Sequence, residues 1–150
     1  MEVFRISKID YADKITSSGS ENRWNYRGQN VIYTGSSRSL STLELIVHKS
    51  SIIPKIEYKV MVISIADYDH LIKQIQIADL PHEWRKISAY SELQKIGSEW
   101  YENQETLVLK VPSAIIPNEY NYVINLEHPG FSDNILLVRV EDYFWDKRLI

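Results

Sequence analysis

The sequence has no cysteine, and it has only five glycines among its 150 residues. Without cysteine the chain forms no disulfide and no thiolate metal site, a usage typical of the cytoplasm. No window of about 18 uninterrupted apolar residues occurs, so the sequence predicts no membrane-spanning helix. The start, "MEVFRISKIDYADK", mixes acidic and basic residues and lacks the apolar core of about 7–15 residues typical of a signal peptide. We therefore expect a cytoplasmic protein that does not bind a membrane.

Several familiar catalytic motifs are missing as well. GxGxxG, the P-loop, HExxH and GxSxG are all absent, so no motif predicts Rossmann-type dinucleotide binding, NTP hydrolysis, zincin chemistry or a nucleophile elbow. The four histidines have no metal-ligand spacing, so we expect no metal ion. The net charge of −3 argues against direct nucleic-acid binding, which usually needs a concentrated basic face.

What is present fits one folded domain. Hydrophobic residues make up 44% of the chain and charged residues 25%, which is enough apolar content for a single core over residues 1–150. No period of 20–50 residues repeats, and no Gly/Ser-rich or Pro-rich linker divides the chain. The ten tyrosines and four tryptophans supply core area, and such rings also stack on planar ligands.

Six segments have the β-branched and aromatic content, or the alternation, that predicts strands. They are residues 3–6, "NVIYTG", residues 55–65, "TLVLKV", "YNYVIN" and "NILLVRV". The segment 55–65 is apolar on both faces, so we expect it near the centre of a sheet.

Two segments predict helices. The first begins at Ser39 or Ser41 and runs to about Lys49, and the second lies in "SELQKIGSEWYEN". In the second, one helical face carries Leu93, Ile96, Gly97, Trp100 and Tyr101. The segment "YDHLIKQIQI" fits either a helix or an irregular stretch. Strands outnumber helices and do not alternate strictly with them, so the sequence predicts an α+β domain.

Glu44 raises a question, because helical spacing places it on the same side as Leu40, Leu43 and Val47. One interpretation is a capping box in Ser41-Thr42-Leu43-Glu44, where the glutamate bonds the amide of the N-cap residue. The other is a carboxylate that faces a ligand cleft. From the pattern alone the capping box is favoured.

Arg23, Trp24 and Tyr33 allow two interpretations each. A guanidinium beside a planar ring suits a phosphate ligand, but from the residues alone a surface arginine stacked on its neighbouring tryptophan is the favoured interpretation. Tyr33 shares a strand face with Val31, and its ring can stack on a flat ligand or belong to the core.

The segment "VPSAIIPNEYNYVIN" is also unusual. Ser113 follows a strand-ending proline, and Asn118, Asn121 and Asn125 follow within a dozen residues. Turn chemistry explains serine and asparagine after proline, while three asparagines at this spacing could also line a polar pocket. The residues alone leave both possibilities open.

The order of short motifs along nearly the whole chain resembles the RES domain family, named for an arginine, a glutamate and a serine. The motifs are "FR" (Phe4-Arg5), "RWN" (Arg23 to Asn25), "YTG" (Tyr33 to Gly35), "LE" followed by a histidine (Leu43-Glu44, His48), "IG-x-x-W" (Ile96 to Trp100), "VPSA" (Val111 to Ala114), an asparagine pair before "HP" (Asn121, Asn125, His128-Pro129) and a terminal "F-x-D-x-R-L" (Phe144 to Leu149).

The resemblance implies an ADP-ribosyltransferase-like fold and a toxin that consumes NAD⁺ as a substrate, with no cofactor. It implies that Arg23 holds the pyrophosphate, Tyr33 stacks on the nicotinamide, Glu44 stabilises the developing positive charge and Ser113 orients the ribose or Glu44. Further contacts to NAD⁺ are implied for the motif residues and their neighbours: Arg5, Trp24, Asn25, Ser36, Asn121 and Asn125. The family pairing also implies a helix-turn-helix antitoxin as partner.

Three functions are compatible with this resemblance. The first is a toxin that releases nicotinamide from NAD⁺ by hydrolysis or phosphorolysis. The second is transfer of ADP-ribose to a protein, and the third is a catalytically silent module that binds the antitoxin. The chain departs from the family in the loop "SSGSEN", where Glu21-Asn22 replaces a glycine pair before Arg23. The C-terminal "DYFWDKRLI" is either a homodimer interface or the last strand of the core.

Overall fold

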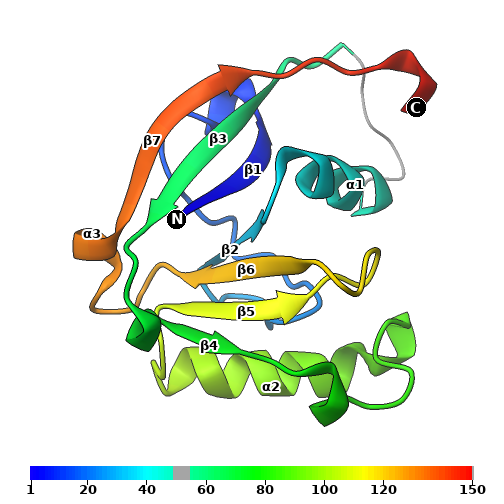
Figure 1. Cartoon of the computed structure of the whole chain (residues 1–150), viewed down its shortest axis with the longest axis vertical. Helices are drawn as coiled ribbons and strands as arrows, with labels where there is room; N and C mark the ends of the chain where they lie inside the picture. The colour runs from blue at the N-terminus through cyan, green and yellow to red at the C-terminus, as the bar shows by residue number, and fades with distance from the viewer. Residues whose placement is uncertain (49–54, 150) are drawn as a thin grey trace.

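The computed structural model describes residues 1–48 and 55–149. Within these residues one sheet of seven strands has the order β4-β5-β6-β2-β1-β3-β7 (Figure 1). The strands are β1 (Glu2–Lys8), β2 (Val31–Gly35), β3 (Tyr58–Ile65), β4 (Ile72–Gln74), β5 (Val108–Pro112), β6 (Tyr120–Asn125) and β7 (Ile135–Asp142). The helices are α1 (Arg38–His48), α2 (Tyr90–Glu102) and the short α3 (Phe131–Asn134). The predicted α+β class is confirmed, with a mixed sheet and flanking helices.

The sheet consists of two half-sheets that are joined at one point. β1 pairs with β3 along its whole length, from Glu2 opposite Ser64 to Lys8 opposite Tyr58, but it meets β2 only where Phe4 lies opposite Gly35. Beyond that pair β1 and β2 diverge. The half-sheet β4-β5-β6-β2 therefore separates from β1-β3-β7, and α1 lies beside the opening (Figure 1).

α2 packs on the half-sheet β4-β5-β6-β2 (Figure 1). Its residues Leu93, Gly97 and Trp100 are buried, and Leu93 and Trp100 belong to a cluster with Trp24 and strand residues such as Val123. Ile96 and Tyr101 pack against the same cluster. The predicted apolar face of this helix is confirmed in all five residues.

Gly97 is needed because the backbone of Trp24 lies directly against α2. A Cβ at position 97 would lie 1.7 Å from the carbonyl oxygen of Trp24, so Gly97→Ala must push the two backbones apart. We expect a loss of about 3 kcal/mol in the free energy of unfolding, at the upper end for overpacking. Urea unfolding followed by tryptophan fluorescence measures this loss, with Ser91→Ala on the exposed side of α2 as the control. Equal stability of the two variants would contradict the contact.

The capping box predicted at Ser41 is wrong. α1 begins at Arg38, and the amide of Leu40 donates to Ser37 Oγ at 3.0 Å, so Ser37 is the residue that caps the helix. Ser41 lies inside the helix, where its hydroxyl donates to the carbonyl of Phe4 at 2.9 Å. The apolar side predicted for this helix does not extend to Val47, because that residue is 63% exposed.

Other boundaries differ from the expectation in smaller ways. β3 begins at Tyr58 rather than at residue 55, and it lies next to the edge strand β7 rather than near the centre of the sheet. The stretch "YDHLIKQIQI" contains a short 3₁₀-helix at Asp69–Leu71 followed by strand β4 at Ile72–Gln74, which pairs parallel with β5, so it is neither an α-helix nor wholly irregular. Lys49, the expected end of the first helix, lies outside the described residues.

The C-terminal segment is not a strand beyond Asp142. Tyr143 and Trp145 pack instead on a core cluster that contains Tyr58, whereas Phe144 is 83% exposed. Ile150 lies outside the described residues, and the homodimer stays a prediction.

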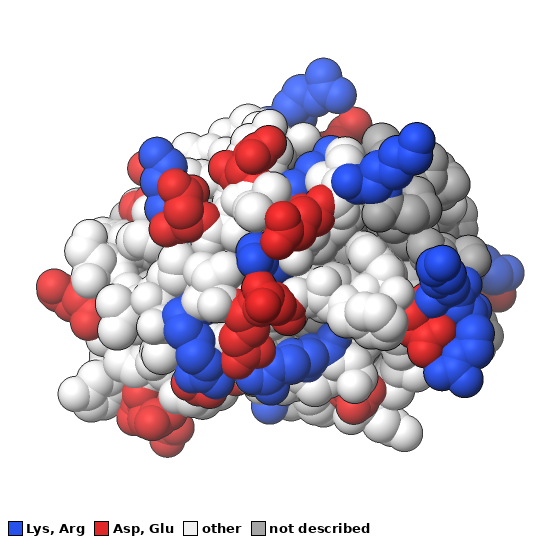
Figure 2. All heavy atoms as spheres, turned by 90° about the horizontal axis from the view of Figure 1, so that it is seen from above, with Lys and Arg blue, Asp and Glu red and all other residues white. Residues whose placement is uncertain are grey.

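The charged side chains do not gather by sign on the face shown in Figure 2, where Lys and Arg are interspersed with Asp and Glu. Ion pairs join several of the charges along the chain, such as Arg38 with Glu141 at 2.8 Å and Lys59 with Asp142 at 2.6 Å. No helix in residues 1–48 or 55–149 is both long and apolar enough to cross a membrane.

Candidate active site

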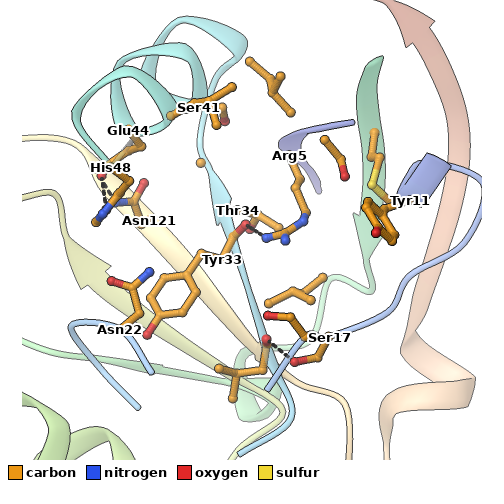
Figure 3. Close-up of a pocket in the computed structure, with 18 of the residues that line it drawn as sticks. Arg5, Tyr11, Ser17, Asn22, Tyr33, Thr34, Ser41, Glu44, His48 and Asn121 are labelled. Atoms are coloured by element: carbon orange, nitrogen blue, oxygen red, sulfur yellow. Dashed lines mark hydrogen bonds and ion pairs between the residues drawn. The ribbon is translucent and has the colours of Figure 1, made fainter. Parts of the chain in front are cut away.

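A cavity of about 560 Å³ opens where β1 and β2 diverge. Its walls come from β1, β2, α1 and the loop between β1 and β2, together with Met61 of β3 and Asn121 of β6. This size lies within the range of pockets for small ligands. Figure 3 shows Glu44, His48 and Asn121 grouped on one side of the cavity, with Asn22 and Tyr33 nearby.

Glu44 projects from α1 and is held by three side chains. Its Oε1 accepts hydrogen bonds from Ser113 Oγ at 2.8 Å and from Asn121 Nδ2 at 2.7 Å. Its Oε2 lies 3.5 Å from Nε2 of His48, one helical turn further along α1. The structure therefore brings Glu44 next to Ser113 and Asn121, which lie 69 and 77 residues further along the chain.

The carboxylate of Glu44 is kept in its charged form by these contacts. Burial alone would raise its pKa, but the hydrogen bonds from His48, Asn121 and Ser113 act in the opposite direction and are together stronger. The pKa of Glu44 is therefore lowered from its usual value. The result is a fixed negative charge at the wall of the cavity.

Ser113 is fully buried, directly after the last residue of β5. Its Oγ accepts hydrogen bonds from the backbone amides of Ile115 and Ile116, both at 3.1 Å. Because these two donors occupy the acceptor side of the oxygen, its own proton is directed to Glu44. Ser113 thus orients the carboxylate.

Arg5 is the arginine that lines the cavity. Its Nη1 donates to the carbonyl oxygen of Tyr33 at 3.0 Å, across the gap between β1 and β2. Burial lowers the pKa of Arg5 from its usual value, and among the residues that the structure describes no carboxylate forms an ion pair with it. A partly desolvated cation without a counter-ion favours an anionic ligand.

Arg23, in contrast, does not line the cavity. Its Nη1 donates to the carbonyl oxygens of Trp84 and Arg85 at 3.1 and 3.2 Å, and its guanidinium lies 4.7 Å from the ring centre of Tyr90. These contacts attach the turn at residues 22–25 to the segment before α2. The predicted stack on the neighbouring Trp24 is replaced by the stack on Tyr90.

Tyr33 lines the cavity, and its hydroxyl is fixed by the "RWN" turn. The amide of Trp24 donates to Tyr33 Oη at 3.1 Å, and Oη donates to Asn25 Oδ1 at 2.5 Å. Burial raises the pKa of Tyr33 well above its usual value, so the phenol stays protonated. Trp24 and Asn25 are buried and contribute to the site by positioning Tyr33.

Two other predicted contact residues lie outside the cavity. Ser36 is exposed and bonds through its amide to the carbonyl of Tyr120. Asn125 is buried at the far end of β6, where its Oδ1 accepts from the amide of Glu127 at 2.9 Å. Of the three asparagines in the unusual segment, Asn121 is the one that lines the cavity.

The replaced glycine pair does not distort the loop. Among the described residues the non-glycine residue with a positive φ is Gln104, so Glu21 and Asn22 adopt backbone angles that any residue tolerates. The positive φ in this loop falls on Gly19, at +72°. Asn22 lines the cavity, and its Oδ1 accepts from the amide of Arg23 at 2.8 Å.

His48 and Tyr11 are cavity residues to which the sequence assigned no role. His48 could have been identified from its i, i+4 spacing to Glu44, which places two side chains on one face of a helix. No motif in the sequence around Tyr11 indicates a role in the cavity, since the segment that carries it comes close to Arg5 only in the folded chain. No cluster of three or more potential metal ligands occurs in the part of the chain that the structure describes.

Comparisons with known proteins extend over the whole sequence. The sequence model of the RES domain matches residues 2–146. A Yersinia enterocolitica protein named "Toxin Res" is 35% identical, over 99% of this chain and 99% of its own. A Sphingobium protein named "Prs ADP-ribosylating toxin" is 33% identical, over 93% of this chain and 88% of its own. A Photorhabdus laumondii "Toxin Res" is 30% identical, over 100% of this chain and 97% of its own.

Proposed function

We propose, from the premise that this chain belongs to the RES domain family, that it is a toxin that breaks the bond between nicotinamide and ribose in NAD⁺. One observation carries the proposal: Glu44, oriented by Ser113 and Asn121, shares a cavity with Arg5, a cation that no carboxylate of the described residues neutralises. The two relatives named toxins and the one named an ADP-ribosylating toxin support it.

The chemistry matches what these residues can supply. Nicotinamide leaves NAD⁺ as a neutral molecule from a cationic ring, so no general acid has to protonate it. The ribose develops oxocarbenium character as the bond breaks, and a preorganised negative charge nearby lowers the barrier. Glu44 supplies that charge without reorganisation, because its carboxylate is already held by Ser113 and Asn121.

The remaining groups bind and orient the substrate. Arg5 supplies the positive charge for the diphosphate, a role for which Arg23 is less suited because its guanidinium is bound to two carbonyls outside the cavity. Tyr33 presents its ring to the nicotinamide side of the cavity while its hydroxyl is fixed by Asn25. NAD⁺ is consumed here as the substrate and no other cofactor takes part.

The direct test incubates the purified protein with NAD⁺, with and without phosphate, and follows the products by NMR. Release of nicotinamide by the parent protein but not by Glu44→Ala would support the proposal. A product that depends on phosphate would identify phosphate as the acceptor, and free ADP-ribose would identify water. No nicotinamide under either condition would refute NAD⁺ cleavage with these acceptors.

Transfer of ADP-ribose to a protein is the second candidate, favoured by the Sphingobium relative named an ADP-ribosylating toxin. The same cavity residues would serve it, because bond breaking is common to both reactions. Labelled NAD⁺ incubated with cell extract and the protein distinguishes them, since label on a protein band that disappears with Glu44→Ala supports transfer. If the Glu44→Ala protein stays toxic, a binding module without catalysis becomes the better account.

We also propose that the partner is a helix-turn-helix antitoxin that inhibits by covering this cavity, because a cell that makes the toxin must survive it. Co-expression with the adjacent gene product, followed by the nicotinamide assay on the complex, tests the idea. A complex that releases nicotinamide as fast as the free protein would contradict it.

The pH dependence of the reaction should report on Glu44 and His48. The reaction needs the charged carboxylate, and the pKa of Glu44 is lowered from 4.5, so kcat/KM should persist through that pH and fall only below it. His48→Gln removes one cause of the lowered pKa and should move this acidic limb to higher pH. Profiles of nicotinamide release from about pH 3 to 8, with the exposed His82→Gln as the control, measure the shift. An unmoved limb would show that His48 does not act on Glu44.

A further inference from the structure

We propose that the part of the cavity on the far side of Arg5 from Glu44 is the subsite for the purine base of the ligand, with Tyr11 as its stacking ring. We call this part the Tyr11 lobe and define it by Tyr11, Ile15 and Met61. The inference rests on the proposed function, since it assumes a dinucleotide whose reactive end lies at Glu44.

Arg5 divides the cavity between two groups of residues. Figure 3 shows Glu44 and Asn121 on one side of Arg5 and Tyr11 on the other. Arg5 lies opposite Met61 across the β1–β3 pair, and opposite residues of antiparallel strands point to the same face. The guanidinium therefore stands between the carboxylate side of the cavity and a side that contains Met61.

The two sides differ in chemistry. Glu44, His48 and Asn121 make one side polar, whereas Ile15 and Met61 belong to or pack on the main apolar cluster of the core. The same cluster includes Ile32, which also lines the cavity. A flat apolar base with polar edges fits the second side, because its faces require apolar contact and its edges require hydrogen-bond partners.

Tyr11 is free to provide that contact. Its side chain is 63% exposed although it lines the cavity, and within the described residues no ring or cation stacks on it. Thr16 lines the same cavity and offers a hydroxyl to the edge of a base, whereas the hydroxyl of Ser18 donates to Ser20 Oγ at 3.1 Å. Ser17 is less available, since its hydroxyl donates to the carbonyl of Val31 at 3.0 Å.

The order of groups in a dinucleotide then fixes the assignment. The diphosphate lies between the two nucleosides, and Arg5 is the cation that lies between the two sides of the cavity. With the reactive ribose at Glu44 and the diphosphate at Arg5, the purine falls in the Tyr11 lobe.

Calorimetric titration of the whole chain with ADP-ribose tests the lobe, because this ligand carries the purine and diphosphate but has no bond to cleave. Tyr11→Ala should weaken ADP-ribose binding by roughly tenfold, as expected when a base loses its aromatic platform. Tyr11→Phe should restore it, and Tyr68→Ala, at another exposed tyrosine, should bind like the parent. Thermal melting of each variant checks that the fold is retained.

The outcomes separate this inference from the proposed function. Equal affinity of Tyr11→Ala and the parent for ADP-ribose would overturn the lobe, even if NAD⁺ is cleaved. Failure of the parent to bind ADP-ribose while it still releases nicotinamide would also overturn it. Binding that depends on Tyr11 without any NAD⁺ cleavage would support the lobe and reject the proposed reaction.

Discussion

Glu44→Gln is expected to lower kcat for nicotinamide release by about 100- to 1,000-fold, the usual effect of removing one preorganised electrostatic contact from an active site. Glutamine has the same shape and keeps an oxygen to accept hydrogen bonds from Ser113 and Asn121. What it loses is the negative charge. The substitution therefore isolates the electrostatic role of the carboxylate from its role in holding Ser113 and Asn121.

The measurement is single-turnover nicotinamide release by Glu44→Gln and by Glu92→Gln, an exposed glutamate of α2 that serves as the matched control. The control should cleave NAD⁺ at the parental rate. The affinity of Glu44→Gln for ADP-ribose should change little, because charge stabilisation belongs to the transition state. Activity of Glu44→Gln within a few fold of the parent would remove Glu44 from the mechanism.

Arg5→Met is expected to weaken the binding of NAD⁺ and ADP-ribose by roughly 30-fold or more, since loss of one partner of a charge-assisted contact usually costs about 2 kcal/mol or more. Methionine keeps most of the length of the side chain and removes the charge. Replacement of Arg5 removes one hydrogen bond, to the carbonyl oxygen of Tyr33, but it also removes a buried cation that has no ion-pair partner among the described residues. These two effects oppose each other, so the free energy of unfolding should change little.

Arg23→Met should show the opposite pattern. It removes the hydrogen bonds to the carbonyls of Trp84 and Arg85, so we expect a lower melting temperature and a smaller loss of affinity. Calorimetry and thermal melting of both variants decide which arginine carries the diphosphate. If Arg23→Met lost more affinity than Arg5→Met at an unchanged melting temperature, the family-based role of Arg23 would stand and our assignment to Arg5 would be wrong.

The sequence predicted those features of the fold that depend on local periodicity. The face of α2 and the alternation of Val31 and Tyr33 against Ile32 were correct because each follows from side-chain spacing within one element. The start of α1 was not, because "GSSRSLSTLE" offers several capping residues. The choice between them depends on Ser41 bonding to the carbonyl of Phe4, a contact 37 residues distant in the chain.

Strand β4 was not predicted, because it too depends on a contact that is distant in the sequence. Its three residues gain strand geometry from parallel pairing with β5, and nothing within Ile72–Gln74 encodes that partner. A segment this short takes its conformation from its neighbour in the sheet.

In the candidate site, too, the sequence identified residues by their motifs but did not show where every side chain lies in the folded chain. The order of motifs identified Glu44, Ser113 and Asn121, which the fold brings within hydrogen-bonding distance. The resemblance assigned the pyrophosphate to Arg23, whereas the structure places Arg5 in the lining of the cavity. Each arginine sits beside an aromatic residue, and neither stretch shows which guanidinium faces the cavity. That choice is made by the divergence of β1 and β2, which exposes Arg5 to the cavity.

The single pair between Phe4 and Gly35 has a consequence for how the molecule unfolds. With so little ladder between β1 and β2, the two half-sheets are held together mainly by the apolar cluster that they share, so local opening in one half-sheet can differ in free energy from opening in the other. A ligand that contacts Arg5 on β1 and Glu44 beside the other half-sheet would couple the opening of the two half-sheets. Amide exchange should then slow in both half-sheets together when the cavity is filled, so the substrate itself would make the two half-sheets open as one unit.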